Sequence, residues 1–571
     1  MVRKIFERVA APVRDLVMRP IRSLHQAAYL LAALTLASQA LALLRDRTFA
    51  HTFGAGQVLD LYYAAFRMPD LVFALVSSLV SAYVLIPRIA GMDREKTREL
   101  LSESASFLLI VGGVICVVLG VFMPQFLALL YPDFVASPNQ AEFILLARIL
   151  LVQPILLGLS GIISSVTQVD RRFALFALSP LLYNLGIIFG VVELYPLWGL
   201  PGIGIGVVIG AIAYLVIHIP VVMSAGVAPR LSLPTFSLMF SVVRDSVPRS
   251  LALGVKSFML LILTAIASRL GTGEISVFTF ASNLEAVPLA LIGSSYAIAA
   301  FPALSEAFTR ERREEFVKIL STGARHIILW SIVALGLIVV LRAHIVRVVL
   351  GTGAFDWNAT RLTAALLAIL AVGLVVDALG LLFVRALYAA RQSWRPLVYQ
   401  LAAAFVTIML AIIFLSLPHA ELAAPISAVL KVDDIAGTAI LLVALASILG
   451  QFFLVALSLF ALRNIAPGLG RTLVRPVLDG CVAAFAGGAA AYATLMLEGG
   501  IAPLTTLLAV FTQGLVAGAA GLTIAACALY VVENEEFRIV TSALERLLRA
   551  RGAEAVALPS AAEEPLSPNL P

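Results

Sequence analysis

Charged residues are scarce in this chain. They make up 13% of its 571 residues, while 61% are hydrophobic, and the mean hydropathy is +1.01. Soluble globular proteins carry about 25% charged residues, so the composition excludes a soluble globular protein. The apolar runs are long and continuous rather than short and alternating, which excludes a transmembrane β-barrel.

Cysteine and catalytic motifs are also scarce. The three cysteines, Cys116, Cys481 and Cys527, lie inside apolar runs and have neither metal-ligand spacing nor the pattern of a disulfide framework. The sequence has no Walker A loop, HExxH, GxSxG or paired-carboxylate site in a soluble domain. We therefore expect no enzyme and no cofactor. Energy for any transport would come from an ion gradient or the membrane potential.

Long apolar runs dominate the chain. A bilayer core needs about 20 apolar residues per helix, and this length predicts an all-α polytopic membrane protein with about 14 spans. The predicted spans cover residues 27–44, 59–87, 104–130, 142–167, 174–196, 199–225, 250–270, 277–304, 322–349, 362–390, 396–417, 436–462, 476–497 and 503–533.

Basic residues alternate between the loops. With a cytoplasmic N-terminus, the cytoplasmic segments hold 29 of the 40 Lys and Arg residues, as the positive-inside rule requires. This predicts a multi-pass protein of the bacterial inner membrane with both termini in the cytoplasm. The net charge of +6 follows from this loop bias and gives no reason to expect nucleic acid as a partner.

The chain contains a weak internal duplication. Phe53-Gly54-Ala55-Gly56, Pro69, Ile86-Pro87 and Tyr131-Pro132-Asp133-Phe134 each have a counterpart 215 to 221 residues later. Six helices separate equivalent points, so the copies have the same orientation and predict two parallel six-helix lobes around a central cavity. Such an architecture is typical of alternating-access carriers.

The duplication divides the chain into six segments. We expect spans 13 and 14 to form a tight hairpin, because small residues such as Gly487 and the Gly514–Gly518 pair at GxxxG spacing allow close packing; a groove for a lipid tail beside it is the alternative. The predicted segments are 1–26, a basic amphipathic cytoplasmic N-terminus; 27–225, the N-lobe; 226–249, a cytoplasmic linker; 250–462, the C-lobe; 463–533, the two additional spans; and 534–571, a cytoplasmic tail that is partly disordered.

Ionisable residues inside the spans are the candidate site. Each costs about 2.5–3.5 kcal/mol at mid-bilayer unless it has a partner or a wet cavity. Asp60, Arg67 and Asp70 share one face of span 2, where Arg67 and Asp70 either form an ion pair or face the cavity. Asp377 either binds a coupling cation or proton or caps a bend. Lys256, Glu285 and Arg385 complete the set, Lys256 and Arg385 as cavity cations that suit an anionic substrate.

Several motifs resemble those of the MurJ/MviN lipid II flippases. They are Ser38 to Arg45-Asp46, Phe53 to Gly56 with Asp60, Ala65 to Pro69, Asn283-Leu284-Glu285 with Phe301 to Ser305, and Gly353 to Phe355 with Arg385 to Ala389. The resemblance covers essentially the whole chain. It implies a member of the multidrug/oligosaccharidyl-lipid/polysaccharide exporter superfamily, with Arg45, Asp46 and Asp60 among the cavity residues.

The chain departs from the family pattern at three expected cations. Gln39, Phe73 and Asn283 stand where the family usually has basic residues. Lys256, Arg67 and Arg385 are the candidates for replacement charge.

The resemblance implies a flippase for lipid II, an undecaprenyl-diphosphate-linked peptidoglycan precursor. We expect it to be a monomer, driven by membrane potential or an ion gradient. Membrane lipids and a possible coupling ion are its other expected partners. The alternatives are a flippase for another polyprenyl-linked glycan, a cation-coupled exporter of the same superfamily, and a non-transporting scaffold for envelope synthesis.

Overall fold

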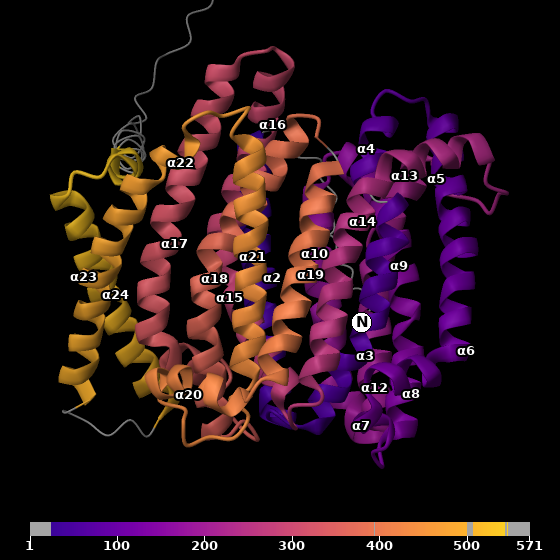
Figure 1. Ribbon diagram of the computed structural model, residues 1–571. Helices are drawn as coiled ribbons and strands as arrows, with labels where there is room; N and C mark the ends of the chain where they lie inside the picture. The colour runs from indigo at the N-terminus through magenta and orange to yellow at the C-terminus, as the bar shows by residue number, and fades with distance from the viewer. Residues whose placement is uncertain (1–23, 81, 393, 500–505, 543–544, 546–571) are drawn as a thin grey trace, which may run out of the picture.

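The computed structural model describes residues 24–80, 82–392, 394–499, 506–542 and 545, and this part of the chain contains helices and no strand. The expected interfacial N-terminal helix and most of the expected disordered tail lie outside the described residues. The helices stand roughly side by side in one bundle (Figure 1). This confirms the expected all-α polytopic fold.

Thirteen helical segments of the described chain are long and apolar enough to cross a membrane. A further helix, α2 (Leu24–Phe53), stands at the position of the first predicted span. The thirteen segments match predicted spans 2 to 14: Gln57–Ile89, Arg94–Leu130, Gln140–Val169, Ala174–Trp198, Leu200–Ala225, Arg249–Ala267, Glu274–Thr309, Arg313–Val349, Trp357–Ala389, Trp394–Ser416, Ile440–Leu462, Leu469–Glu498 and Leu507–Val531.

The first half of the chain forms one group of packed helices. Here α2 packs mainly on α10, and α3, α8, α9 and α12 pack on one another. The elements after α2 are α3 (Gln57–Leu75), η1 (Ser77–Val80), α4 (Ala82–Ile89), α5 (Arg94–Phe107), η2 (Leu108–Gly112), α6 (Gly113–Leu130), α7 (Pro132–Val135), α8 (Gln140–Leu150), α9 (Val152–Val169), α10 (Phe173–Phe189), η3 (Gly190–Leu194), α11 (Tyr195–Trp198), α12 (Leu200–Val216) and α13 (Ile219–Ala225).

A second group follows, in which α18 packs on α15, α17 and α21, and α19 packs on α14 and α21. Its elements are α14 (Phe236–Ala267), α15 (Glu274–Pro288), η4 (Leu289–Ser294), α16 (Ser295–Thr309), α17 (Arg313–Val349), α18 (Trp357–Ala389), α19 (Trp394–Ser416), α20 (His419–Leu430) and α21 (Ile440–Leu462).

The second and eighth spanning segments are both interrupted. The first is divided into α3, η1 and α4, and the other into α15, the π-helix η4 and α16. Pro69 lies within α3, and Pro288 is the last residue of α15. The interruption after α3 begins seven residues beyond Pro69, whereas η4 begins directly after Pro288. The paired interruptions agree with the duplication predicted from these prolines.

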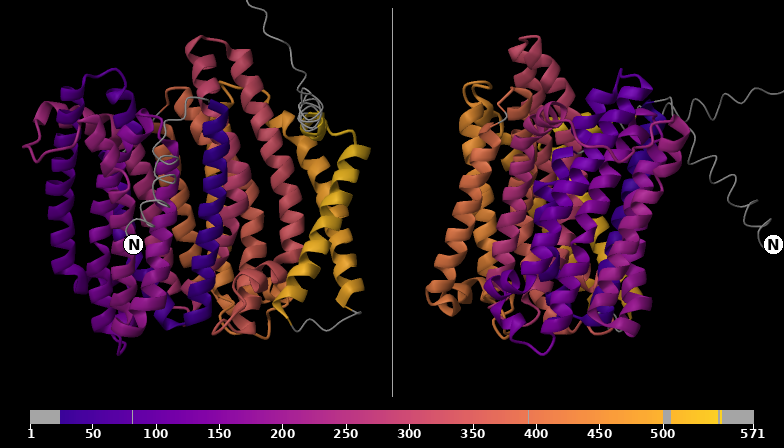
Figure 2. Two further views of the ribbon diagram at one scale, coloured as in Figure 1. Left: turned by 180° about the vertical axis from the view of Figure 1, so that it is seen from behind. Right: turned by 90° about the vertical axis from the view of Figure 1, so that its right-hand side faces the viewer.

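After α21 come α22 (Leu469–Thr472), α23 (Val474–Gly499) and α24 (Leu507–Val531), which pack beside α17 at one side of the bundle (Figures 1 and 2). Residues 535–542, which follow α24, are also helical. A Cβ at Gly487 would lie 2.7 Å from the Gly521 carbonyl oxygen, so α23 and α24 make the close contact expected of a hairpin. The predicted role of Gly514 and Gly518 in that contact is wrong. These two glycines face His344 and Leu341 of α17.

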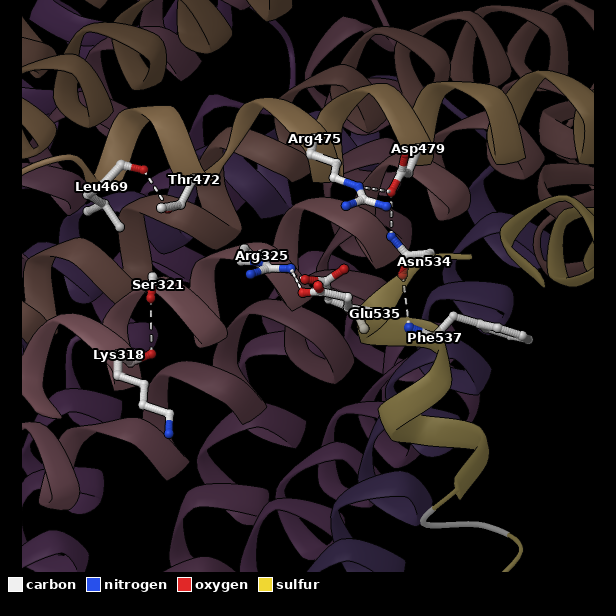
Figure 3. Close-up of polar contacts among 11 residues, drawn as sticks. Lys318, Ser321, Arg325, Leu469, Thr472, Arg475, Asp479, Asn534, Glu535 and Phe537 are labelled. Carbon is white, nitrogen blue, oxygen red and sulfur yellow. Dashed lines mark hydrogen bonds and ion pairs between the residues drawn. The ribbon is translucent and has the colours of Figure 1, made fainter. Parts of the chain in front are cut away.

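Polar contacts attach one end of this hairpin to α17 (Figure 3). Arg325 Nη2 lies 2.6 Å from Glu535 Oε2, and Arg325 also forms an ion pair with Glu536. Asn534 Nδ2 donates to Asp479 Oδ2 at 2.8 Å. The chain after α24 is therefore held to α17 and α23 at the end of the bundle that the charge pattern predicts to be cytoplasmic.

Candidate functional site

A polar network joins three helices next to Arg45. Arg45 Nε and Nη2 donate to Asp46 Oδ1 at 3.0 and 2.7 Å, and Arg45 Nη1 donates to Asn184 Oδ1 of α10 at 3.0 Å. Asn283 Nδ2 of α15 donates to Asp46 Oδ2 at 3.0 Å. Asp46 is buried, whereas the Arg45 side chain is 21% exposed. The network holds a partly accessible guanidinium where the two groups of helices meet.

Asp60 lies in a different place from this network. It is fully buried on α3 and accepts hydrogen bonds from Gly273 N at 2.5 Å, Ser276 N at 2.8 Å and Ser276 Oγ at 2.5 Å. These donors are at the N-terminus of α15, where unpaired N–H groups and the helix dipole favour a carboxylate. Asp60 therefore joins the two groups, and its carboxylate is occupied by this contact.

Further contacts surround Asp60 at the end of the bundle that the charge pattern predicts to be outer. Ala354 N donates to His51 O at 2.9 Å, and Arg47 Nη1 donates to Val348 O at 2.6 Å. The turn at Gly54, with φ +61°, is so close to Ala354 that a Cβ would lie 2.5 Å from the Ala354 carbonyl oxygen. At this end, the backbone of the first group near Gly54 therefore lies in direct contact with the backbone of the second group at Ala354.

A second line of contacts runs along α14. Arg67 Nε donates to Thr264 Oγ1 at 2.9 Å. Further along, the hydroxyls of Ser78 and Ser250 are 2.7 Å apart, and Ser246 Oγ donates to Leu79 O at 2.6 Å. We call the contact between α14 and the α3–η1 segment the seam, and each of these hydrogen bonds across it uses a single Ser or Thr hydroxyl group.

Arg67 and Asp70 lie on the same helix, as predicted, and both are half-buried. They interact electrostatically, while the hydrogen bond of the Arg67 side chain goes to Thr264. Among the ion pairs of the described residues there is none between Arg67 and Asp70, and the hydrogen bond of Arg67 instead reaches across the seam.

Three more predicted residues come together in the second group. Glu285 of α15 is buried and interacts electrostatically with Asp377 of α18 and Lys256 of α14. Asp377 also interacts with Lys256. One positive charge faces two carboxylates, so a single negative charge is left uncompensated when all three are ionised.

Arg385 is half-buried on α18, away from the Arg45 network. Its Nη1 donates to Ser294 O at 3.4 Å. Ser294 is the last residue of the π-helix η4, where the regular pattern of helix hydrogen bonds is interrupted. An arginine donor to this carbonyl partly satisfies a group that would otherwise be costly within a membrane.

The three positions that depart from the family pattern have different surroundings. Gln39 is half-buried on α2, and Phe73 is 39% exposed on α3. Asn283 belongs to the Arg45 network through its bond to Asp46. An amide at position 283 binds the Asp46 carboxylate without adding a positive charge.

Sequence reasoning missed Asn184, Thr264 and Ser276, which are partners of predicted residues. Each is a polar side chain inside or next to an apolar span, and that was the available signal. Their partners lie 139, 197 and 216 residues away in the chain, so the pairing itself could not be read from sequence. The described residues contain no group of three or more His, Cys, Asp or Glu side chains that could hold a metal ion.

Comparison with known proteins agrees with this architecture. The sequence profile of the family described as lipid II flippase MurJ matches residues 49–463. The lipid II flippase MurJ of Burkholderia cenocepacia is 25% identical over 408 residues, which cover 69% of this chain and 79% of that protein. The probable lipid II flippase MurJ of Bdellovibrio bacteriovorus is 27% identical over 398 residues, which cover 68% and 76%.

Solved structures show the same fold. A lipid II flippase MurJ in an inward closed conformation matches with a TM-score of 0.69 and 18% identity, covering 89% of this chain and all of that one. An inward-facing multidrug resistance transporter of the MATE family and MOP superfamily matches with a TM-score of 0.61 and 15% identity, covering 76% and 96%. On the profile match, which spans most of the chain, this membrane protein belongs to the MurJ lipid II flippase family.

Proposed function

We propose that this chain moves lipid II from the inner to the outer leaflet of the bacterial inner membrane by alternating access. The observation that supports this most directly is the Arg45 network in a chain of this family. Bonds to Asp46 and Asn184 use three of the five N–H donors of Arg45. The guanidinium is thereby oriented, and its other donors can bind a diphosphate oxygen.

The contacts at the predicted outer end support the direction of opening. Asp60, Ala354 and Arg47 take part in bonds that hold the two groups together there. In the proposed cycle this end is closed while the substrate head group enters from the cytoplasmic side. Separation of these contacts then releases the head group outside, while the lipid tail stays in the bilayer.

The membrane potential is one proposed driving force. An inside-negative field favours outward movement of a dianion by about 4–5 kcal/mol per 100 mV for a full crossing. The cluster of Lys256, Glu285 and Asp377 supports a second contribution, since its uncompensated negative charge suits a coupling proton or monovalent cation. Collapse of the potential alone, compared with collapse of a proton or sodium gradient alone, separates these sources.

A flippase for another polyprenyl-diphosphate-linked glycan is the second candidate. Gln39, Phe73 and Asn283 favour it, because a changed set of cavity cations would suit a changed head group. The likeness to the MATE transporter supports the common fold alone, and the positive charge of Arg45 and Arg67 disfavours a cavity for cationic drugs.

The test is complementation of a strain depleted of its lipid II flippase, with leaflet-resolved labelling of lipid II. We expect the wild-type chain to restore lipid II to the outer leaflet. Arg45→Ala should abolish this while the protein still inserts in the membrane, and Arg310→Ala, an exposed arginine paired with Glu306, should complement normally. Lipid II trapped inside despite normal expression of the wild-type chain would overturn the proposal and favour another glycan.

A further inference from the structure

The connection between α13 and α14 is an extended segment attached to α5. The segment has no helix or strand from 227 to 235. Both α5 and α13 lie at the predicted cytoplasmic end of the bundle, as does the start of α14 (Figure 1). We refer to residues 230–235 as the strap.

Buried polar side chains of α5 accept hydrogen bonds from the strap. Arg230 N donates to Ser102 Oγ at 2.9 Å, and Ser232 N donates to Ser106 Oγ at 3.1 Å. Alternate N–H groups of an extended chain point to one side, and residues four apart share a helix face. The register of the strap therefore matches the spacing of Ser102 and Ser106.

Glu103 binds the end of the strap more strongly. Its Oε2 accepts from Thr235 N at 2.9 Å, and its Oε1 accepts from Thr235 Oγ1 at 2.7 Å. Glu103 is 4% exposed, so a charged side chain is buried in order to make this contact. Hydrogen bonds to a charged group are stronger than neutral ones, and Thr235 directly precedes α14.

Two leucines of the strap project away from the protein. Leu231 and Leu233 are 86% and 88% exposed, among the highest exposures of any large hydrophobic residue described. With Leu109 and Ile110 of η2 they border an apolar hollow of about 280 Å³. Leu109 and Ile110 are themselves exposed within a segment long enough to span the membrane, so their surroundings are lipid.

We propose that the strap is a membrane-interface anchor whose Leu231 and Leu233 insert into the inner leaflet beside η2, with an acyl chain of an anionic phospholipid in the hollow. Arg230 is exposed next to these leucines, and a guanidinium at this depth pairs with lipid phosphates. An extended backbone at this depth is stabilised when its N–H groups have partners. Ser102, Ser106 and Glu103 provide partners for the N–H groups of residues 230, 232 and 235.

The anchor restricts how far the connection between the two groups of helices can move. The strap is bonded to α5 in the first group, and α14 begins immediately after Thr235. Movement of α14 must therefore either bend the chain at this point or pull on the anchor. This inference concerns the position of the connection in the membrane and holds whichever substrate is transported.

Depth measurements with nitroxide labels test the anchor. Full-length protein with Cys116, Cys481 and Cys527 replaced by Ala is labelled at Leu231→Cys or Leu233→Cys, in vesicles of phosphatidylethanolamine and phosphatidylglycerol. Oxygen concentrates in lipid and Ni(II)EDDA in water. Val117→Cys on α6, where Val117 is 67% exposed, is the lipid reference, and Lys96→Cys on α5 is the water reference.

We expect the labels at 231, 233 and 117 to be more accessible to oxygen than to Ni(II)EDDA, and the label at 96 to be more accessible to Ni(II)EDDA. Nickel access equal to that at 96 would overturn the proposal, because the strap would then lie in water. Low access to both reagents would also overturn it, since a second copy or another protein would then cover the leucines.

Variants of α5 test the attachment. Glu103→Ala removes both acceptors of Thr235, so the label at 233 should become more mobile and more accessible to Ni(II)EDDA than to oxygen. Glu103→Gln keeps one acceptor oxygen and should preserve part of the label's preference for oxygen. Glu99→Ala, an exposed residue one turn earlier, should leave the label unchanged. Equal depth in Glu103→Ala and wild-type protein, with both eluting as single species, would show that Glu103 does not hold the strap.

Discussion

Two of the contacts between the groups of helices, the outer end and the seam, are built from different chemistry. At the predicted outer end, the buried Asp60 carboxylate accepts three bonds from Gly273 and Ser276, and backbone approaches backbone at Gly54. Along the seam, the groups are joined by single hydroxyls such as Ser246 and Ser250.

In the proposed alternating-access cycle, this difference identifies the outer contact as the closure. Hydrogen bonds from several donors to a charged acceptor are stronger than a bond between neutral hydroxyl groups. Close contacts between backbones are lost when the two groups of helices shift relative to each other. Serine and threonine hydroxyls within helices can instead bond their own helix backbone, as Ser246 Oγ also does with Val242 O at 2.8 Å. The seam can therefore exchange partners at low cost as the groups move, whereas the outer contact is either made or broken.

Removing Asp60 should have the largest effect. Asp60→Ala leaves the Gly273 and Ser276 donors without their acceptor and should destabilise the closed outer end by about 3–5 kcal/mol. A cysteine at Ala50, a buried residue of α2 near this end, should then react faster with an impermeant methanethiosulfonate added outside. Asp60→Asn keeps one acceptor and should have a smaller effect. Asp133→Ala, an exposed carboxylate of α7, is the control, and an unchanged rate in Asp60→Ala would contradict the comparison.

A methyl group at Gly273 should have the next largest effect. Gly273 has φ +89°, and a Cβ would lie 2.5 Å from the Ala55 carbonyl oxygen. Left-handed backbone alone costs Ala about 1–2 kcal/mol, and the clash adds to it. Gly91→Ala is the matched control, because Gly91 has φ +97° and nothing within 4 Å of a Cβ. The same Ala50 cysteine assay should respond to Gly273→Ala and not to Gly91→Ala; equal responses would mean that backbone strain, rather than the contact, is responsible.

Substitutions along the seam should have small effects. Ser246→Ala and Ser250→Ala each remove one neutral hydroxyl bond across the seam. Each should lower the free energy of unfolding by about 1 kcal/mol. We expect complementation to be retained in both. The reference is Ser321→Ala, which removes a half-buried hydroxyl bonded to Lys318 O. Loss of complementation in either variant would contradict the small effect expected of the seam.

The exposed Arg325–Glu535 contact should have the smallest effect and a defined pH dependence. The hydrogen bond and charge of Arg325 lower the pKa of Glu535. A carboxylate with a lowered pKa contributes stability above its ordinary pKa, about 4.3, and loses it as the pH falls through the lowered value. The melting temperature of wild-type protein should therefore exceed that of Glu535→Gln at neutral pH, with the difference vanishing in acid. A difference that persists in acid would exclude ionisation of Glu535 as its cause.

Much of the fold could be predicted because the bilayer restricts what an apolar segment can do. A run of about 20 apolar residues in lipid must be helical to satisfy its backbone, so predicted spans 2 to 14 all match helices of the structure. Pairing was less predictable. Gly514 and Gly518 have the spacing of a helix contact, but they face α17 rather than α23, because spacing does not specify which neighbour a helix face meets.

The sequence by itself determined the membrane class, the positions of the spans and the family resemblance, and it singled out Arg45 and Asp46 as candidate site residues. Only the tertiary structure decided that Asp60 binds the start of α15, that Asn184 orients Arg45, and that Ser102 and Glu103 hold the strap. The first set depends on local length, charge and motif. The second depends on how helices cross, and crossing brings together residues more than a hundred positions apart that no local pattern connects.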